Sequence, residues 1–538
     1  MRGRIFEHCS SISNVHKYMS IIPVIDHSTG TMSKITSCVG LCILSTLCLA
    51  TAGTVQQLLQ LNIPDAPPPG TQTLSGSFQG YSIEVASFAD MAGNLTTPNK
   101  LSYRMLQNLK ETSGSAVPIR VGGTTANHEI WVPNQKEAII QNFATSGAEQ
   151  PANITWGPRY MESFQVFSKG TKYTVGVTFD SSTKGEDASV SEATEFLQKY
   201  REKLICSGTF PVDRNTTTWS INQYVPEWLS RISAIASRVL PKDNQKLFQA
   251  GVFVAPGSFS ADLSWTAQAA IDFGIASTGL AKTFCTHQYF GAACQPVKPT
   301  LAGNVMNRTA LTQQMNYHAG ASAYSTSKGL SYVIGETNSI ACQGLAGASD
   351  VFGAAMWSID YAFYAASLNV SSMYWHMGTG YRYSAWQAPQ NGTTTLGPRP
   401  LYYGNWFIAT ALGHSDARVV PIVNTTSLAG YAIYSSKRHR SELKSIVLVN
   451  MEVFNSTSTP ASQRSSVDFA LPEQLGGKRC QGSVRRLTAA GAEVRDGIIF
   501  AGRKVGLDGT INGHESKELV ARGVVNVKAS EAVLVTLG

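Results

Sequence analysis

The chain has 538 residues, of which 43% are hydrophobic and 14% are charged, and its formal net charge is +8. This hydrophobic content excludes a largely disordered chain and allows two or three domains, or one large barrel with a partner domain. Lys and Arg are scattered rather than gathered in a basic stripe, which argues against a nucleic-acid-binding protein. Beyond the N-terminal region, no stretch reaches the roughly 18 consecutive apolar residues that a membrane-spanning helix needs.

The first 52 residues are predicted to be a leader. A short basic region precedes an apolar run over 39–49, and an Ala-Thr-Ala cleavage site follows at 50–52. This is the pattern of a secretory signal peptide, which we place at 32–52, and 1–31 is interpreted as an over-extended gene model. An uncleaved signal anchor is the alternative. We expect a secreted protein with no membrane contact after cleavage.

The cysteines and the glycosylation sequons bear on the expectation that the protein is secreted. Of the five cysteines that remain after the leader, Cys285 and Cys294 are close enough in sequence for a local disulfide, and we predict that pair. With His287 they could instead ligate zinc, but the spacing fits no standard site and a fourth ligand is missing. No metal or cofactor is therefore predicted. The N-x-[ST] sequons, typical of a glycosylated secreted protein, are at Asn94, Asn153, Asn215, Asn307, Asn369, Asn391, Asn424 and Asn455.

An alternation of short strands and helices predicts an α/β fold over 75–395. The helical segments are 191–203, 224–239, 265–273 and 349–368, and an eighth strand has room between 200 and 220. Strand–helix alternation at this repeat length is typical of parallel β/α architecture, and we predict a (β/α)8 TIM barrel. The seven strands expected from β-branched and apolar runs are 81–85, 117–121, 173–178, 249–254, 283–287, 331–334 and 372–375.

After the barrel the pattern changes. Strands such as 445–449 follow one another without intervening helices, and glycine-containing turns separate them. This predicts a β-sandwich domain over 396–538. The strand-like residues 54–63 and 72–80 precede the barrel and are expected to pair with the sandwich, so the segment 54–74 is assigned to that domain.

Polar side chains follow the strands at the predicted mouth of the barrel, where TIM barrels carry their active sites. Glu336 directly follows the strand at 331–334, and its carboxylate is expected to point into the mouth. A retaining glycosidase uses two carboxylates about 5–5.5 Å apart, and Glu336 is a natural nucleophile. The alternative is an ion pair with a neighbouring arginine such as Arg120. Tyrosines, amides and carboxylates around such a mouth suit a sugar; the other candidates are Glu84, Thr124, His287, Tyr289, Gly380 and Tyr381.

Several of these segments resemble glycoside hydrolase family 79, which holds β-glucuronidases and heparanase, and the likeness is greatest to fungal members. The resemblance runs from about residue 75 to the C-terminus. Each motif is short, but together they occur in order and at the spacing of barrel strands. The matching segments are 81–94, 119–123, 286–290, 335–339 and 378–381.

The resemblance implies a retaining exo-acting enzyme that releases β-linked glucuronic acid, or its 4-O-methyl form, from glycans. It implies that Glu336 is the nucleophile, and that Tyr381 and the backbone around Gly380 hold the uronate carboxylate. The other matched residues have packing at the barrel mouth as their alternative role: Glu84 and Thr124 would bind sugar hydroxyls, and His287 and Tyr289 would line the surroundings of the nucleophile.

One motif of the family is missing from the chain. Family members carry Asn-Glu at the end of the fourth strand, and that glutamate is the acid/base. The corresponding segment 204–216 contains no glutamate; its one carboxylate is Asp213, and Glu227 beyond it lies in a helix-like stretch. The fourth strand and its tip are interpreted as deleted or misread. Two hypotheses follow: a faulty splice junction that hides an active enzyme, or a paralogue that binds carbohydrate without cleaving it.

Overall fold

The computed structural model describes most of the chain beyond the predicted leader. Residues 1–57, which contain the leader, lie outside the described residues. The described ranges are 58–146, 148, 150–180, 183–200, 204–208, 219–239, 246–256, 264–388, 395–437, 440–472, 482–520 and 522–537.

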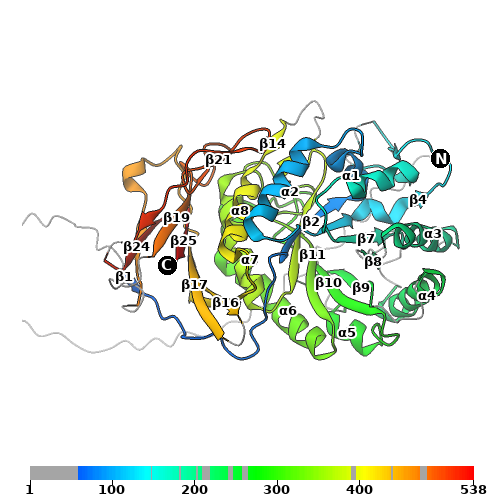
Figure 1. Cartoon of the computed structure of the whole chain (residues 1–538), viewed down its shortest axis with the longest axis horizontal. Helices are drawn as coiled ribbons and strands as arrows, with labels where there is room; N and C mark the ends of the chain where they lie inside the picture. The colour runs from blue at the N-terminus through cyan, green and yellow to red at the C-terminus, as the bar shows by residue number, and fades with distance from the viewer. Residues whose placement is uncertain are drawn as a thin grey trace, which may run out of the picture. The chain divides into compact units, whose positions relative to one another are not determined.

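Eight parallel strands form a closed barrel, which confirms the predicted fold class (Figure 1). Each strand pairs with the next one along the chain, and the eighth pairs with the first. The fourth strand is present, so the interpretation that it is deleted is wrong; the segment 209–218 after it lies outside the described residues. The strands are β2 (Gln79–Glu84), β3 (Ile119–Gly122), β7 (Tyr173–Val177), β8 (Leu204–Gly208), β9 (Phe248–Val254), β10 (Ala281–Tyr289), β11 (Ser331–Asn338) and β12 (Ser372–Met377).

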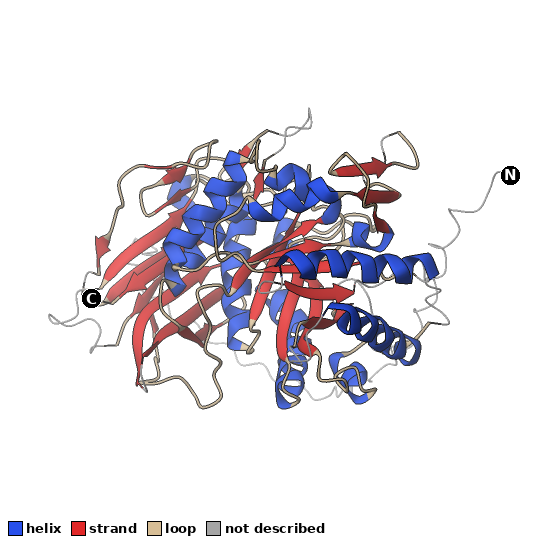
Figure 2. Ribbon diagram, turned by 45° about the vertical axis from the view of Figure 1, so that its right-hand side comes forward, coloured by secondary structure: helices blue, strands red, loops and turns tan. Residues whose placement is uncertain are grey.

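Helices surround the barrel strands, as Figure 2 shows. Side chains cap three of them at the N-terminus: Asn99 accepts a hydrogen bond from the backbone N–H of Ser102, Thr266 accepts one from Ala269, and Asn307 accepts one from Ala310. The helices are α1 (Val85–Ala92), α2 (Lys100–Ser113), α3 (Thr183–Tyr200), α4 (Ile221–Val239), α5 (Ala267–Asp272), α6 (Arg308–Ser327), α7 (Phe352–Ser367) and α8 (Pro400–Leu412).

Short elements fill the loops between the strands and helices of the barrel. A three-stranded sheet follows β3, and the sequence did not predict it. The short strands are β4 (Glu129–Trp131), β5 (Ile139–Asn142), β6 (Asn153–Trp156), β13 (Trp386–Gln387) and β14 (Gly397–Pro398), and the short helices are η1 (Thr124–His128), η2 (Pro158–Gln165) and η3 (Leu301–Val305).

The barrel is longer than the sequence predicted. Its last helix, α8, packs against α2 and α7, so the barrel layer runs to Leu412 rather than ending at 395. Figure 1 shows α7 and α8 between the barrel strands and the sheet that contains β16 and β17. Helix α8 begins with Pro400, two residues after β14 ends, and completes the last β/α unit.

Two sheets form the C-terminal β domain. The larger, seven-stranded sheet is antiparallel, and the smaller has three strands. Strand β1, before the barrel, pairs with β18 of the smaller sheet, and Leu74 pairs with Ala417 of the larger one. The larger sheet contains β15 (Ala417–Asn424), β16 (Leu428–Lys437), β17 (Arg440–Asn450), β19 (Ser483–Thr488), β20 (Ile499–Phe500), β23 (Glu518–Leu519) and β25 (Glu531–Thr536); the smaller contains β1 (Leu58–Gln60), β18 (Ser466–Ala470) and β24 (Val524–Lys528); β21 (Lys504–Val505), β22 (Ile511–Asn512) and η4 (Ala461–Gln463) lie outside both.

Alternation along β17 explains how the larger sheet is buried on both faces. Ile446 and Leu448 pack into the core between the two sheets, whereas Val447 and Val449 belong to the core that extends into the barrel. Successive side chains of a strand point to opposite faces, so the uninterrupted apolar run 446–449 serves both cores.

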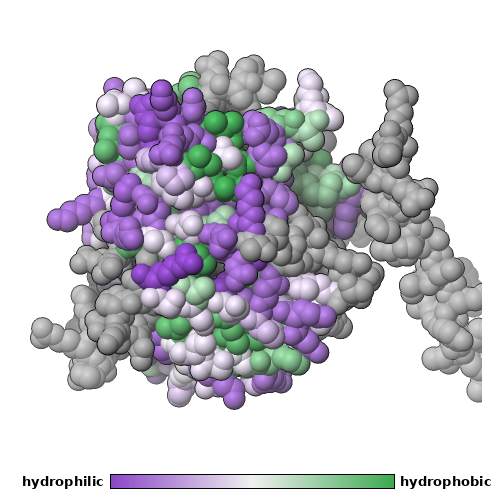
Figure 3. Space-filling model, turned by 90° about the vertical axis from the view of Figure 1, so that its right-hand side faces the viewer, coloured by the Kyte–Doolittle hydropathy of each residue, from purple (hydrophilic) through white to green (hydrophobic). Residues whose placement is uncertain are grey.

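The surface offers no large apolar face in the view of Figure 3, where hydrophobic residues occur in small groups between hydrophilic ones. Within the described part of the chain, no helix combines the length and the hydrophobicity that crossing a bilayer needs.

Candidate active site

A bulge in β11 turns Glu336 into the barrel. Val333 packs inside the barrel and Ile334 outside it, so strict alternation would send residue 336 outward. The register with β10 shifts by one residue at Gly335, and Glu336 lies beside His287. An extra residue of this kind re-aims the side chains that follow it. Gly335 is required there because a Cβ atom would collide with the sulfur of Cys285.

Four side chains hold the Glu336 carboxylate. Arg120 donates to Oε2 over 2.6 Å, and the Tyr289 hydroxyl donates to Oε1 over 2.8 Å. His287 Nδ1 lies 3.6 Å from Oε1, and His376 Nδ1 lies 3.8 Å from Oε2. Both oxygens therefore have fixed partners, and the carboxylate is oriented before any ligand arrives.

The groups around Glu336 favour its ionised form. Burial opposes ionisation, but His376, His287, Arg120 and the Tyr289 hydrogen bond together hold the pKa of Glu336 well below its usual range. Burial lowers the pKa of His287 to about 3, so that imidazole is neutral at neutral pH. Burial also acts against protonation of His376, yet Glu336 and Glu84 raise its pKa. The site thus presents an ionised carboxylate, as a nucleophile at an anomeric carbon requires.

Glu84 is the second carboxylate of the site and ends β2. Its Oε1 accepts hydrogen bonds from the backbone N–H and the hydroxyl of Thr125, at 2.8 and 2.5 Å. Its Oε2 lies 3.2 Å from His376 Nε2. Every one of these partners can donate to an ionised carboxylate, which suits a hydrogen-bond acceptor for sugar hydroxyls better than a proton donor. Gly123, with a φ of 108°, leaves room for this carboxylate, because a Cβ there would overlap it.

Glu336 and Glu84 open into one cavity of about 380 Å³, a volume that suits a sugar ring. Tyrosine rings form much of its wall: the Tyr381 and Tyr383 rings meet edge to face with centroids 5.7 Å apart. The Tyr381 hydroxyl accepts a hydrogen bond of 3.1 Å from Gln150. The lining residues are Glu84, Thr124, Gln150, Tyr289, Glu336, Ala341, Cys342, Gln343, His376, Tyr381 and Tyr383.

The structure brings most of the predicted site residues together. Of the seven, His287 lies behind Glu336 without lining the cavity, and Gly380 lines a neighbouring cavity. The Gly380 N–H donates to the Gln387 side chain over 3.1 Å, so this amide already has an acceptor. Arg120 pairs with Glu336, as the alternative interpretation expected, but it does so inside the barrel, so the ion pair and the site are the same feature.

Sequence reasoning missed His376 and Gln150. His376 is buried near the end of β12 and contacts both carboxylates, so applying the strand-end rule to the eighth strand would have identified it. Gln150 lies between β5 and β6 of the small sheet, and no sequence pattern indicates that this segment reaches the barrel mouth.

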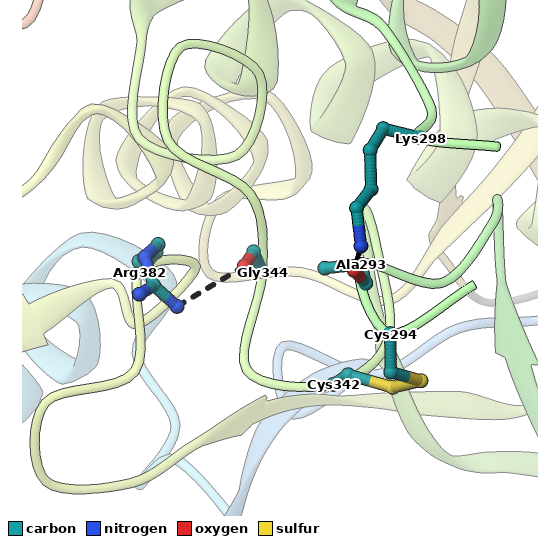
Figure 4. The surroundings of a disulfide bond; sticks show 6 residues. All are labelled: Ala293, Cys294, Lys298, Cys342, Gly344 and Arg382. Atoms are coloured by element: carbon teal, nitrogen blue, oxygen red, sulfur yellow. Dashed lines mark hydrogen bonds between the residues drawn. A yellow bond between two sulfur atoms is a disulfide. The ribbon is translucent and has the colours of Figure 1, made fainter. Parts of the chain in front are cut away.

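The predicted Cys285–Cys294 disulfide is wrong, because Cys294 pairs with Cys342 and Cys285 is a buried thiol. Cys285 lies within β10 and packs inside the barrel against Val252 and Val333. Cys294 and Cys342 follow the neighbouring parallel strands β10 and β11, whose C-terminal ends meet at one edge of the barrel. The disulfide ties these two loops together beside the cavity (Figure 4).

The chemistry at the cavity rests on carboxylates. Within the described residues, no group of three or more His, Cys, Asp or Glu is arranged to hold a metal ion, and Cys294 is taken up by its disulfide. Glu84 and Glu336 are the carboxylates among the described residues that line the cavity. Glu227 pairs with Arg231 on α4, and Asp213 lies outside the described residues.

Comparison with known proteins gives matches along most of the chain. Residues 430–534 match the model of the glycosyl hydrolase family 79 C-terminal beta domain. A protein of Aspergillus niger named β-glucuronidase is 29% identical over 456 residues, which are 79% of this chain and 82% of the relative. A second β-glucuronidase, from Neurospora crassa, is 29% identical over 513 residues, which are 86% of this chain and 89% of the relative.

Two solved structures share the fold. A 4-O-α-L-rhamnosyl-β-D-glucuronidase from Fusarium oxysporum has a TM-score of 0.76 at 23% identity and covers 89% of this chain and all of its own. A family 51 α-L-arabinofuranosidase from Bifidobacterium longum has a TM-score of 0.56 at 11% identity, covering 90% of this chain and all of its own. At these identities the likeness extends to the architecture of a barrel with a C-terminal β domain.

Proposed function

We propose that this chain, which resembles glycoside hydrolase family 79 along its barrel and carries that family's C-terminal β domain, is a retaining exo-glycosidase that releases β-linked glucuronic acid or 4-O-methylglucuronic acid from glycans. The observation that carries the proposal is the ionised, pre-oriented carboxylate of Glu336 at the wall of a sugar-sized cavity. The cationic partners Arg120 and His376 beside it suit an acidic sugar, because they offset negative charge brought into a buried site.

The residues present can perform the first half of such a reaction. A Glu336 oxygen attacks the anomeric carbon, the bond from that carbon to the aglycone oxygen breaks, and a glycosyl ester forms on Glu336. Arg120 and Tyr289 bind the carboxylate while it is a nucleophile and while it leaves again. Protonation of the aglycone oxygen needs an acid, and Glu84 is poorly suited to that task because donors occupy both of its oxygens.

The test uses a leaving group that departs without acid assistance. With p-nitrophenyl β-glucuronide, we expect a burst approaching one p-nitrophenolate per chain as the glycosyl ester accumulates on Glu336. Azide should then raise the steady-state rate by attacking the anomeric carbon and releasing a β-glucuronyl azide. Glu336→Gln should abolish the burst, whereas the exposed control Glu111→Gln should retain it.

The second candidate function is carbohydrate binding without cleavage. The observation that favours it is the absence of glutamate from 204–216, where the family carries its acid/base. It predicts no burst and no azide effect, together with glucuronate binding that Tyr381→Ala weakens. A burst that depends on Glu336 would reject this second candidate.

We also propose that the chain is secreted and glycosylated. The signal-peptide pattern at 32–52, the sequons and the Cys294–Cys342 disulfide support this, since disulfides persist in oxidising compartments. Expression in a fungal host should deliver the protein to the medium with a mass that falls after endoglycosidase treatment. Retention inside the cell at the unmodified mass would contradict the proposal.

A further inference from the structure

A second cavity, which we call the junction cavity, lies where loops of the barrel meet the β domain. Its volume is about 510 Å³. Four parts of the chain contribute to its wall: the loop after β11, the loop after β12, the start of α8, and the β domain. Its wall includes Gly380 and the charged residues Asp350, Arg382, Arg399, Arg495 and Asp496.

The junction cavity and the Glu336 cavity lie on two sides of the same loop. Gly380 lines the junction cavity, and the next residue, Tyr381, lines the Glu336 cavity. The backbone N–H of Arg382 donates to the carbonyl of Gln343 over 2.7 Å, and Gln343 also lines the Glu336 cavity. The loop after β12 therefore contributes residues to the walls of both cavities.

Three arginines face the junction cavity, and two of them form no ion pair with a carboxylate among the described residues. Arg495 pairs with Asp350 over 2.9 Å. Among the described residues, no carboxylate lies within 4.0 Å of a nitrogen of Arg382 or Arg399. Both guanidinium groups contact backbone carbonyls instead: Arg399 donates to residues 381 and 382 over 3.3 and 3.1 Å, and Arg382 points towards the carbonyl of Gly344 at 3.5 Å (Figure 4).

The guanidinium groups around the junction cavity repel one another. Burial lowers the pKa of Arg399; Asp350 opposes that change, and Arg382 and Arg495 add to it. An oxyanion between Arg382 and Arg399 would turn this repulsion into attraction, because guanidinium groups bind carboxylate and sulfate through paired, charge-assisted hydrogen bonds. Asp350 is already engaged by Arg495, so Asp496 is the remaining carboxylate of the wall.

We propose that the junction cavity is an anion-binding site that holds the carboxylate or sulfate group of an acidic saccharide. Its volume exceeds what a bare inorganic anion fills, and its position one loop away from a sugar-sized cavity suits a second residue of the same class of ligand. The inference goes beyond the proposed function, because binding at Arg382 and Arg399 requires no turnover at Glu336.

The experiment is a thermal-shift titration of the full chain. The probes are sodium glucuronate and sodium sulfate, with glucose as the neutral sugar and sodium chloride at matched ionic strength. The variants are R382Q and the double variant R382Q/R399Q, with R418Q on β15 as the matched control. Because Arg399 also holds two loop carbonyls, the single variant of the exposed Arg382 keeps the test valid if the double variant folds poorly.

We expect both anions to raise the unfolding temperature beyond chloride, and R382Q to weaken the response to each about tenfold, with R418Q titrating as the wild type. Glucuronate binding in the Glu336 cavity remains visible as the part that E336Q alters and R382Q does not. If the part of the response that depends on Glu336 is absent, the result counts against the proposed function. The part of the response that depends on Arg382 would still support the junction site. A response to sulfate alone, or responses that R382Q and R382Q/R399Q leave unchanged, would overturn the junction site.

Discussion

The core of the β domain and the C-terminal end of the barrel bury strands of similar length around opposite kinds of side chain. Between the two sheets the packed residues are aliphatic or aromatic, such as Leu448, Phe469 and Val533. At the barrel end, Arg120, Glu336 and other ionisable groups are almost as deeply buried. Charged groups lose their hydration when they are buried, even when they are paired, so the barrel end gives up stability to hold a reactive group.

This difference affects how the resemblance should be used. The family model matches 430–534, and none of the residues that line the Glu336 cavity lies in that range. The part of the chain that is easiest to recognise therefore contributes stability, while the chemistry lies in the barrel and must be tested there. The predictions below separate the two contributions.

The largest effect is expected at the nucleophile. Glu336→Gln should lower kcat/KM for an aryl glucuronide by roughly 10⁴–10⁶-fold, because the amide cannot form the glycosyl ester. The stability of the fold should fall by only about 1–3 kcal/mol, because the amide oxygen still accepts the Arg120 hydrogen bond. Rate assays and urea unfolding of the same preparation measure both quantities. If the loss of activity were no larger than the loss of folded protein explains, Glu336 would have a structural role only.

The matched change in the β domain should have the reverse outcome. Leu448→Ala removes a fully buried side chain between the sheets and should lower the free energy of unfolding by about 2–5 kcal/mol. Activity per folded molecule should stay within twofold of the wild type at a temperature where the variant is folded. A large drop in kcat would mean that the β domain tunes the site directly.

The bulge at Gly335 joins stability to chemistry. Gly335→Ala places a methyl group against the Cys285 sulfur, and we expect a loss of about 1–3 kcal/mol together with reduced activity as Glu336 shifts. Gly320→Ala on α6 is the control: nothing lies near its added methyl group, so the helix should gain about 0.5–1 kcal/mol. If G335A were as active and stable as G320A, the bulge would not position the nucleophile.

The pH dependence of stability depends on two buried carboxyl groups behind the site, Glu129 and Glu192. Burial raises the pKa of Glu192 to about 8, and burial with the charges of Glu192 and Glu84 raises the pKa of Glu129 well above its usual value. A carboxyl group whose pKa is higher in the folded than in the unfolded protein stabilises the fold fully below the unfolded-state pKa near 4.5. That contribution is lost as the pH rises through the folded-state pKa. The unfolding free energy should therefore fall between pH 5 and 8. Glu192→Gln should roughly halve that slope, as measured by unfolding at successive pH values, and an unchanged slope would assign the proton uptake elsewhere.

Much of the scaffold was readable from the sequence because it depends on periodicity. The barrel strands are short apolar runs between helices, and even the fourth strand at 204–208 lies where spacing allowed it. The uninterrupted apolar run 446–449 likewise indicates a strand, and that strand is buried on both faces. Glu336 and Tyr381 were found because residues directly after strands converge at one end of a barrel.

What the sequence could not reveal depends on contacts between distant segments. The partner of Cys294 is 48 residues away, and proximity in sequence favoured the wrong cysteine. Gln150 reaches Tyr381 from the connection between β5 and β6, whose placement no local pattern specifies. The one-residue shift at Gly335 is equally invisible, because a bulge is defined by the neighbouring strand rather than by its own residues.

Helix α7 determines whether the two halves of this protein can be handled apart. Fourteen of its 16 residues are buried, and it contacts β11 through Tyr361 on one side and Tyr431 of the β domain through Asp360 on the other. A chain truncated after α8 would expose to solvent the face of α7 that packs against the β domain. It would also expose the buried ion pair between Arg308 and Asp360. We expect such a fragment to precipitate when expressed, so transplanting this catalytic barrel onto another scaffold requires carrying the sandwich along with it.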